Sequence, residues 1–386
     1  MSAHPQLVVI GNPANRRIAY LQAALERLGR APARVLSYLD VLADAVDWRG
    51  AMANAAVAGA IPAETIVRLE SPGEEFEVER LLLLRGCEAA AREQAPRLDA
   101  AAISQLCFDL GRILHPRQWY LGYRAFLRDM EQTLADAGAR AMNHPADVAA
   151  MFDKPECQAR LAAAGVPIPP PLPECRSFDE LVANMEAADE SRVFVKLAHG
   201  SSASGVVALE RERRRFTAIT TAELVRGPGG VRLYNSLKIR RYTQLCDVRD
   251  LLDQLCAERV QVERWVPKAR LDGQEFDLRI VVIQGRPAQL VVRQSDSPFT
   301  NLHLGNRRGD PAELRRHVGD HWGELEATCA QALSVFPRSL YAGVDIALAP
   351  DFQSHWVIEL NAFGDLLPNV LDEQGRDSYT AELAAL

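Results

Sequence analysis

Short apolar runs alternate with a helical pattern at the start of the chain. Residues 7–10 and 33–38 have the composition of buried strands, and residues 17–28 carry apolar side chains at helical spacing. Strand, helix and strand in this order predict a βαβ unit with parallel strands and a right-handed crossover. The turn at residues 11–13 lacks the several glycines of a dinucleotide-binding loop. It favours a plain tight turn over an anion site at the helix N-terminus.

Helical spacing continues through the middle of the chain. Within residues 64–142 we expect helices at residues 76–87, 100–114 and 123–134. A further helix is expected at residues 151–164, ended by Gly165. The proline-rich residues 166–173 predict an extended connector. We expect the first domain boundary near residues 140–145.

The second half of the chain is richer in strand patterns. Strands are expected at residues 192–197, 206–209, 276–283, 290–293, 340–348 and 355–360. The last four form two pairs, each joined by a short turn sequence. We therefore expect two antiparallel hairpins towards the C-terminus.

Composition narrows the class of protein. The 386 residues suggest two or three domains at roughly 100–200 residues each. The net charge of −7 argues against nucleic-acid binding, because domains that bind nucleic acid usually carry a basic excess. No apolar run reaches the roughly 18 residues of a membrane span, and the first residues lack a signal-peptide pattern. Seven cysteines without a C-x-x-C pair favour reduced thiols over structural zinc, so we expect a cytoplasmic protein.

Acidic and amide side chains meet on the last predicted hairpin. Glu359 and Asn361 lie two residues apart on one strand and so share a face, and the turn returns Asp345 to the neighbouring strand. Two carboxylates and an amide oxygen suit a Mg²⁺ ion that also holds substrate phosphates. Taken alone, the pattern is more often an ordinary hairpin that carries a few acids.

A loop of small residues follows the strand that contains Lys196. Residues 199–205 allow backbone N–H groups to approach phosphate oxygens, although the P-loop pattern G-x-x-x-x-G-K-[ST] is absent. Asp277 and Arg279 share one strand face, and Arg293 lies on the partner strand. An arginine there can neutralise charge on a transferring phosphoryl group, or the three residues form a surface ion-pair ladder.

The order of these features resembles the ATP-grasp superfamily. Along the chain they are Lys154, Lys196 with its loop, Glu263-Arg264-Trp265-Val266, Asp277-x-Arg279, Arg293, Asn301-Leu302-His303-x-Gly305, Asp345 and Glu359-x-Asn361. The series is most similar to the carboxylate–amine ligases of the ribosomal-protein-modifying glutamate ligase and glutathione synthetase type. The resemblance covers residues 143–361. It implies an α/β (α+β) chain with a Rossmann-like pre-ATP-grasp domain (1–140) and a two-lobed ATP-grasp fold with antiparallel sheets (141–262 and 263–386).

The resemblance also implies how the chain holds ATP. Lys154 and Lys196 match the phosphate-binding lysines. Ser201, Ser202 and Gly205 lie in the flap that covers the phosphates. Glu263, Arg264, Trp265 and Val266 match the hinge that reads adenine, Asp277 or Glu275 matches the ribose-binding acid, and Asn301 matches an amide near nucleotide and metal. Ala203 replaces a glycine that is frequent in the flap of the ligases.

Catalytic and metal-binding roles follow from the same resemblance. Arg293, Arg279 and Lys196 would neutralise charge at the transferred phosphate. Asp345, Glu359 and Asn361 match the ligands of two Mg²⁺ ions, with Mn²⁺ as an alternative. The residues after Asn361 depart from the pattern of many relatives, and they lie where such ligases bind the acceptor. The acceptor is therefore not inferred from any relative.

The function implied is an ATP-dependent carboxylate–amine ligase that forms an amide through an acyl phosphate and releases ADP and phosphate. The alternatives are an ATP-grasp kinase and a non-catalytic ATP-binding protein. The carboxylate and amine substrates stay open between small molecules and peptides, and the basic stretches 211–215 and 238–241 are candidate contacts for an acidic substrate. We expect no nucleic-acid or membrane partner. The resemblance to the family is the only basis for expecting a homodimer.

Overall fold

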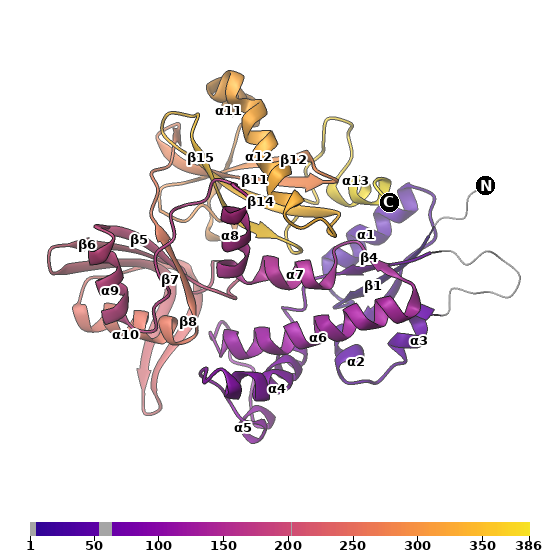
Figure 1. Cartoon of the computed structure of the whole chain (residues 1–386), viewed down its shortest axis with the longest axis horizontal. Coiled ribbons are helices and arrows are strands. Elements are labelled where there is room, and N and C mark those ends of the chain that lie inside the picture. The colour runs from indigo at the N-terminus through magenta and orange to yellow at the C-terminus, as the bar shows by residue number, and fades with distance from the viewer. Residues whose placement is uncertain (1–4, 54–63, 202) are drawn as a thin grey trace, which may run out of the picture.

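The computed structural model describes residues 5–53, 64–201 and 203–386, which form three sheets with helices packed around them (Figure 1). The N-terminal sheet has the order β2-β1-β3-β4 and is parallel throughout. Its strands are β1 (Gln6–Gly11), β2 (Arg34–Ser37), β3 (Thr65–Leu69) and β4 (Arg140–Ala141). The helix α1 (Arg16–Arg27) joins β1 to β2, so the predicted βαβ unit is confirmed.

Helices pack around this sheet. They are α2 (Tyr38–Leu42), α3 (Trp48–Ala53), α4 (Phe76–Arg92) and α6 (Pro116–Ala137), and the short α5 (Ala100–Ser104) packs on α4. The prediction of one helix over residues 100–114 is wrong, because the helix ends at Ser104. The chain then runs as a loop whose backbone pairs with strand β8 of another sheet: Ile113 N donates to Leu233 O, and Gly111 O accepts from Asn235 N. These long-range hydrogen bonds replace the helical ones.

The second sheet is antiparallel, with the order β8-β7-β6-β5-β9. Its strands are β5 (Arg192–Leu197), β6 (Val207–Glu212), β7 (Arg215–Gly227), β8 (Gly230–Tyr242) and β9 (Val260–Arg264). The helices α9 (Phe178–Ala187) and α10 (Leu245–Ala257) pack on one face and close its hydrophobic core. We call this part the flap lobe.

The third sheet has the order β13-β12-β11-β14-β15, and β10 pairs with β11. Its strands are β10 (Arg270–Leu271), β11 (Gln274–Ile283), β12 (Arg286–Ser295), β13 (Arg307–Gly309), β14 (Tyr341–Leu348) and β15 (His355–Asn361). Around it lie α11 (Pro311–Val318), α12 (Trp322–Ser334) and two short 3-10 helices, η1 (Leu302–Leu304) and η2 (Gly319–His321). The two predicted hairpins, β11–β12 and β14–β15, are confirmed as antiparallel pairs. We call this part the C-terminal lobe.

Two helices stand where a single helix was predicted over residues 151–164. These helices are α7 (Pro145–Phe152) and α8 (Lys154–Ala163), and Asp153 separates them. Asp153 has extended backbone angles, and its side chain accepts a hydrogen bond from Glu156 N. The apolar periodicity alone does not reveal this break, but Asp153 and Pro155 mark it, because aspartate favours the N-cap and proline the first turn of a helix.

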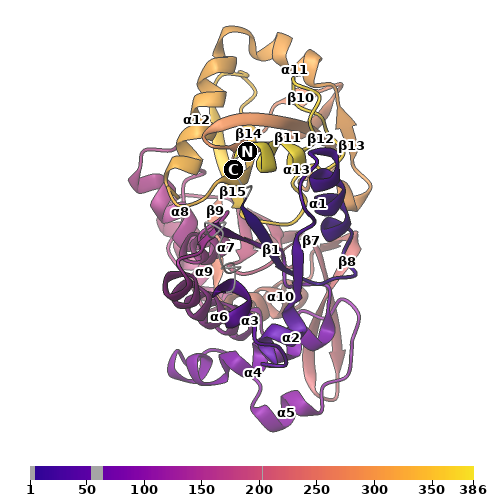
Figure 2. The same ribbon diagram turned by 90° about the vertical axis from the view of Figure 1, so that its right-hand side faces the viewer.

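The C-terminal helix α13 (Ser378–Ala384) returns to the N-terminal domain and lies beside α1 (Figure 2). Leu21 of α1 and Tyr379 and Leu383 of α13 belong to one buried apolar cluster. Across the described residues, no helix is long and apolar enough to cross a membrane.

Helices α4 and α6 cross at two glycines. A Cβ atom on Gly122 would lie 1.9 Å from Leu82 O, and one on Gly86 would lie 2.0 Å from Gln118 O. We expect Gly122→Ala to force the helices apart and to destabilise the protein by about 1–3 kcal/mol, as overpacking does. In Gly323→Ala the added Cβ meets nothing within 4 Å, so this control should be neutral or slightly stabilising. Equal melting temperatures for the two variants would contradict the close approach.

Candidate functional site

A cavity of about 720 Å³ lies where the N-terminal domain, the flap lobe and the C-terminal lobe meet. We call it the interlobe cavity. The predicted site residues that line it are Lys154, Lys196, Ser201, Glu263, Arg264, Val266, Asp277, Arg279, Arg293, Asn301, Asp345, Glu359 and Asn361. They come from segments more than 200 residues apart in the chain, so the fold alone brings them together.

The β14–β15 pairing sets the predicted metal ligands side by side. Asp345 is the register partner of Glu359, and Asn361 is the partner of Gly343. The Asn361 amide donates from Nδ2 to Gly343 O at 3.3 Å, which orients the side chain. Glu359 Oε1 lies 2.9 Å from Lys154 Nζ. A predicted metal ligand and a predicted phosphate-binding lysine thus neutralise each other in the structure.

Two arginines hold Asp345. Arg279 pairs with it through both of its carboxylate oxygens, and Arg293 Nη2 lies 3.1 Å from Asp345 Oδ2. Burial opposes ionisation of Asp345, but the two guanidinium groups outweigh it and lower the pKa of that carboxyl. Arg293 also donates from Nε to Asp277 Oδ1 at 2.6 Å. Asp277 is therefore bound on the cavity wall, where Thr300 Oγ1 donates to its other oxygen.

A second lysine–carboxylate pair lies on the flap lobe. Lys196 of β5 pairs with Glu263 of β9, and Gln261 Nε2 donates to Glu263 Oε2 at 2.8 Å. Burial raises the pKa of Glu263, although the Lys196 ammonium works against this shift. The pair therefore places a lysine charge on the cavity without leaving a lone buried carboxylate.

The donor set of the β14–β15 hairpin fits a hard divalent cation. Asp345, Glu359 and Asn361 offer only oxygen atoms for coordination, which is the chemistry that Mg²⁺ prefers. Within the described ranges, no group of three His, Cys, Asp or Glu side chains is suited to hold a metal ion. The third donor here is an amide, and the two carboxylates are engaged with Lys154, Arg279 and Arg293.

The start of the loop after β5 is held by a buried cluster. The His199 ring stacks on Tyr120 of α6 with 3.9 Å between centroids, and its Nε2 lies 3.1 Å from Asp153 Oδ2. Asp153 caps α8, which begins at Lys154. Lys154 Nζ in turn donates to Gly200 O at 2.6 Å. The cluster fixes Lys154 and the loop relative to the N-terminal domain.

The same cluster makes stability depend on pH. Burial lowers the pKa of His199 from 6.5 to about 4. Between these values the unfolded chain binds more protons than the folded protein, so stability falls as the pH falls through this window. At 1.36 kcal/mol per pKa unit the loss is about 3 kcal/mol. We expect the melting temperature to fall less between about pH 7 and pH 4.5 in His199→Asn than in the wild type. Parallel curves would contradict the assignment.

Three predicted nucleotide contacts lie away from the cavity wall. Gly205 has a φ of +65°, and a Cβ there would meet Leu197 Cδ1 at 2.5 Å, so it serves the turn before β6. The Trp265 ring packs against the Arg192 guanidinium at 3.8 Å. Glu275 pairs with Arg270 at 3.4 Å. Ser202 lies outside the described residues.

Other residues of the cavity were not predicted. The N-terminal domain contributes Arg16, Arg17 and Tyr20 from α1, and the C-terminal lobe contributes Lys268. No local motif marks the residues of α1, because only long-range packing brings this helix to the cavity. The basic stretches 211–215 and 238–241 do not line it. Arg211 pairs instead with Glu186, and Arg240 with Glu223.

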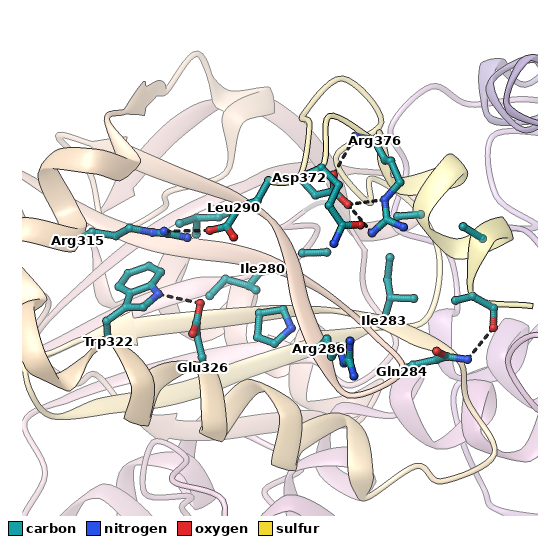
Figure 3. A pocket seen from close by; sticks show the side chains of 17 residues that line it. Ile280, Ile283, Gln284, Arg286, Leu290, Arg315, Trp322, Glu326, Asp372 and Arg376 are labelled. Atoms are coloured by element: carbon teal, nitrogen blue, oxygen red, sulfur yellow. Dashed lines mark hydrogen bonds and ion pairs between the residues drawn. The ribbon is translucent and has the colours of Figure 1, made fainter. Parts of the chain in front are cut away.

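A second cavity, of about 530 Å³, lies on the C-terminal lobe between β11, β12, α12 and the segment before α13 (Figure 3). Its charged side chains are largely committed to one another. Arg315 pairs with Glu373 at 3.2 Å, and Arg376 pairs with Asp372 at 2.9 Å. None of the predicted site residues lies in this cavity.

Comparison with known proteins bears on the fold. No family model matches the chain, and no curated protein sequence matches it. Solved structures do match over nearly the whole length. The chain is similar to the ATP-grasp ligase PsnB complexed with a phosphomimetic variant of its minimal precursor, Mg and ADP, with a TM-score of 0.55 and 16% identity over 99% of this chain and 97% of that one.

Two more solved structures are similar. They are the D-cycloserine synthetase DcsG (TM-score 0.55, 15% identity, 98% of both chains) and the D-alanine–D-alanine ligase from Bacillus anthracis complexed with ATP (TM-score 0.50, 12% identity, 99% of this chain and 96% of that one). The chain therefore has the ATP-grasp fold, preceded by a parallel α/β domain. This confirms the predicted fold class.

Proposed function

We propose that this protein is an ATP-dependent carboxylate–amine ligase. One observation carries the proposal: in an ATP-grasp fold, four of the cations that line the interlobe cavity are each paired with a carboxylate that lines it too. The cations are Lys154, Lys196, Arg279 and Arg293, and the carboxylates are Glu359, Glu263, Asp345 and Asp277. Cations that are already paired with carboxylates in the empty site can exchange these internal partners for a polyanion and its metal ions.

The chain would bind ATP between its two lobes. Lys154 and Lys196 would contact the phosphates, and the backbone of the hinge at Glu263–Val266 would read the adenine. Asp345, Glu359 and Asn361 would hold Mg²⁺, which neutralises phosphate charge when bound. Lys154 would then exchange Glu359 for a phosphate oxygen, and Glu359 would become free to act as a ligand. The solved neighbours complexed with ATP, or with Mg and ADP, support this assignment.

The reaction needs no nucleophilic side chain. A carboxylate oxygen of the substrate attacks the γ-phosphorus of ATP, the bond to ADP breaks, and an acyl phosphate forms. The amine nitrogen of the second substrate then attacks the acyl carbon, phosphate leaves, and the nitrogen loses a proton. Arg279 and Arg293 would stabilise the charge that develops on the transferred group.

The N-terminal domain also contributes residues to the wall of the interlobe cavity. Arg16, Arg17 and Tyr20 of α1 line the cavity there, and we assign this wall to the carboxylate or amine substrate. The solved neighbours include a macrocyclase bound with a precursor peptide and a D-alanine–D-alanine ligase. Either a small molecule or a peptide terminus would therefore be compatible with the site.

Hydroxylamine separates the ligase from a kinase. Candidate carboxylates are first screened by ADP release in the presence of Mg²⁺. With an active carboxylate, a ligase should form the hydroxamate, because hydroxylamine attacks the acyl phosphate in place of the amine. Accumulation of a stable phosphorylated product without hydroxamate would show a kinase and would overturn the ligase proposal.

A further inference from the structure

The distribution of lysine in this chain is uneven. Of its 44 basic residues, 40 are arginines and only four are lysines: Lys154, Lys196, Lys238 and Lys268. Three of the four line the interlobe cavity, and only Lys238 does not. Arginine and lysine are not equivalent, because lysine offers a compact charge that one oxyanion can approach closely. Three of the four lysines thus present a compact charge to the cavity.

Lys268 differs from the other cavity cations in its partners. Lys154, Lys196 and Arg279 each pair with a carboxylate. Lys268 forms no ion pair with any carboxylate that the structure describes, and its Nζ has only Pro298 O, at 3.4 Å, as a hydrogen-bond acceptor. The acids nearest to it are committed elsewhere, Asp277 to Arg293 and Glu275 to Arg270.

An ammonium group without an ion-pair partner in the cavity wall raises the free energy of the protein when the cavity is empty. Burial lowers the pKa of Lys268, and the nearby Asp277 and Glu275, which favour the charged form, do not offset this effect. Lys196 and Arg293 are close enough to act on it as like charges. An anion that enters between these cations would gain the full interaction with Lys268, since no internal ion pair has to be broken first.

We propose that Lys268 is a third phosphate-binding lysine, whose Nζ contacts a phosphate oxygen of the bound nucleotide. The inference rests on the proposed nucleotide site and extends it to a residue outside the motif series. Lys268 follows β9 by four residues. The hinge would therefore carry the adenine contact, and the residue two positions after it would carry a phosphate contact. The flap lobe and the C-terminal lobe would then each supply cations to the phosphates.

Nucleotide affinity tests this role. Full-length Lys268→Met, Lys268→Gln and wild type are titrated with ATP and ADP in the presence of Mg²⁺, and with adenosine in competition with a fluorescent ADP analogue. A charge-assisted hydrogen bond is worth enough to weaken ATP and ADP binding about 10-fold or more. Adenosine, which lacks phosphate, should bind the variants as it binds wild type. Lys238→Met, an exposed lysine outside the cavity, is the matched control and should bind all three ligands normally.

The outcomes separate the inference from the function on which it rests. Unchanged ATP and ADP affinity in both Lys268 variants would overturn the inference and leave the nucleotide site intact. Equal weakening for adenosine and ADP would also overturn it, because Lys268 would then act on the shape of the site alone. A wild type that binds no nucleotide would overturn the proposed function, and the inference with it.

Discussion

Lys196→Met should lower the rate of hydroxamate formation by about 10²–10³-fold, which is the usual effect of removing one preorganised group that stabilises transition-state charge. Lys196 lies on β5 and carries one of the cavity's positive charges. Its removal leaves Glu263 buried without its cation. Because burial already raises the pKa of Glu263, this carboxyl can take up a proton at little cost, so the variant should fold.

The control for this variant is Lys238→Met, the same substitution on the exposed strand β8. It should keep the wild-type rate, and both variants should keep the wild-type melting temperature within a few degrees. A Lys196→Met enzyme with a wild-type rate would exclude Lys196 from the reaction, whatever the rate of the control.

Arg68→Met should destabilise the protein by about 3–5 kcal/mol, the cost of breaking a buried ion pair from one side. Arg68 on β3 is almost fully buried, and its Nε lies 2.7 Å from Glu70 Oε1. Its Nη1 pairs with Glu382 of α13, and its guanidinium lies 4.8 Å from the ring centroid of Tyr379. Without Arg68, Glu382 loses its cation and Glu70 keeps only Arg17, whose Nε lies 3.6 Å from Glu70 Oε2, at the contact between the first sheet and the last helix.

Urea denaturation of the variant measures this cost. The comparison is Arg92→Met, which breaks an ion pair with Glu88 in which both side chains are exposed. That change should alter stability by less than about 0.5 kcal/mol. Similar losses in the two variants would mean that the buried cluster does not hold α13 to the N-terminal domain.

The secondary structure was predicted correctly where the periodicity of apolar side chains is strong. The strands β5, β14 and β15 were predicted within about one residue, because each is a short apolar run bounded by turn residues. Prediction from the sequence failed where tertiary contacts determine the local structure. The segment after Ser104 has helical composition, but it hydrogen-bonds to β8 instead. The break between α7 and α8 was missed for another reason: apolar periodicity does not register the local start signal of Asp153 and Pro155.

The residues of the candidate site likewise fall into some that the sequence predicts and others that depend on tertiary packing. Residues that belong to an ordered series of motifs, such as Asp345 and Glu359, were predicted from sequence, and the structure pairs them in register. The residues that α1 contributes to the cavity were not predicted, because the position of this helix beside the cavity depends on how the domains pack. Lys268 did leave a signal in the sequence: it is one of only four lysines in a chain rich in arginine.

The central claim is that the interlobe cavity binds ATP together with Mg²⁺ held by the β14–β15 hairpin. Calorimetric titration of ATP, with and without Mg²⁺, into wild type and Glu359→Gln tests it most directly. We expect Mg²⁺ to strengthen ATP binding by wild type about 10-fold or more, since it neutralises phosphate charge, and we expect this gain to disappear in Glu359→Gln. Failure of the wild type to bind ATP, or an undiminished Mg²⁺ effect in Glu359→Gln, would contradict the claim.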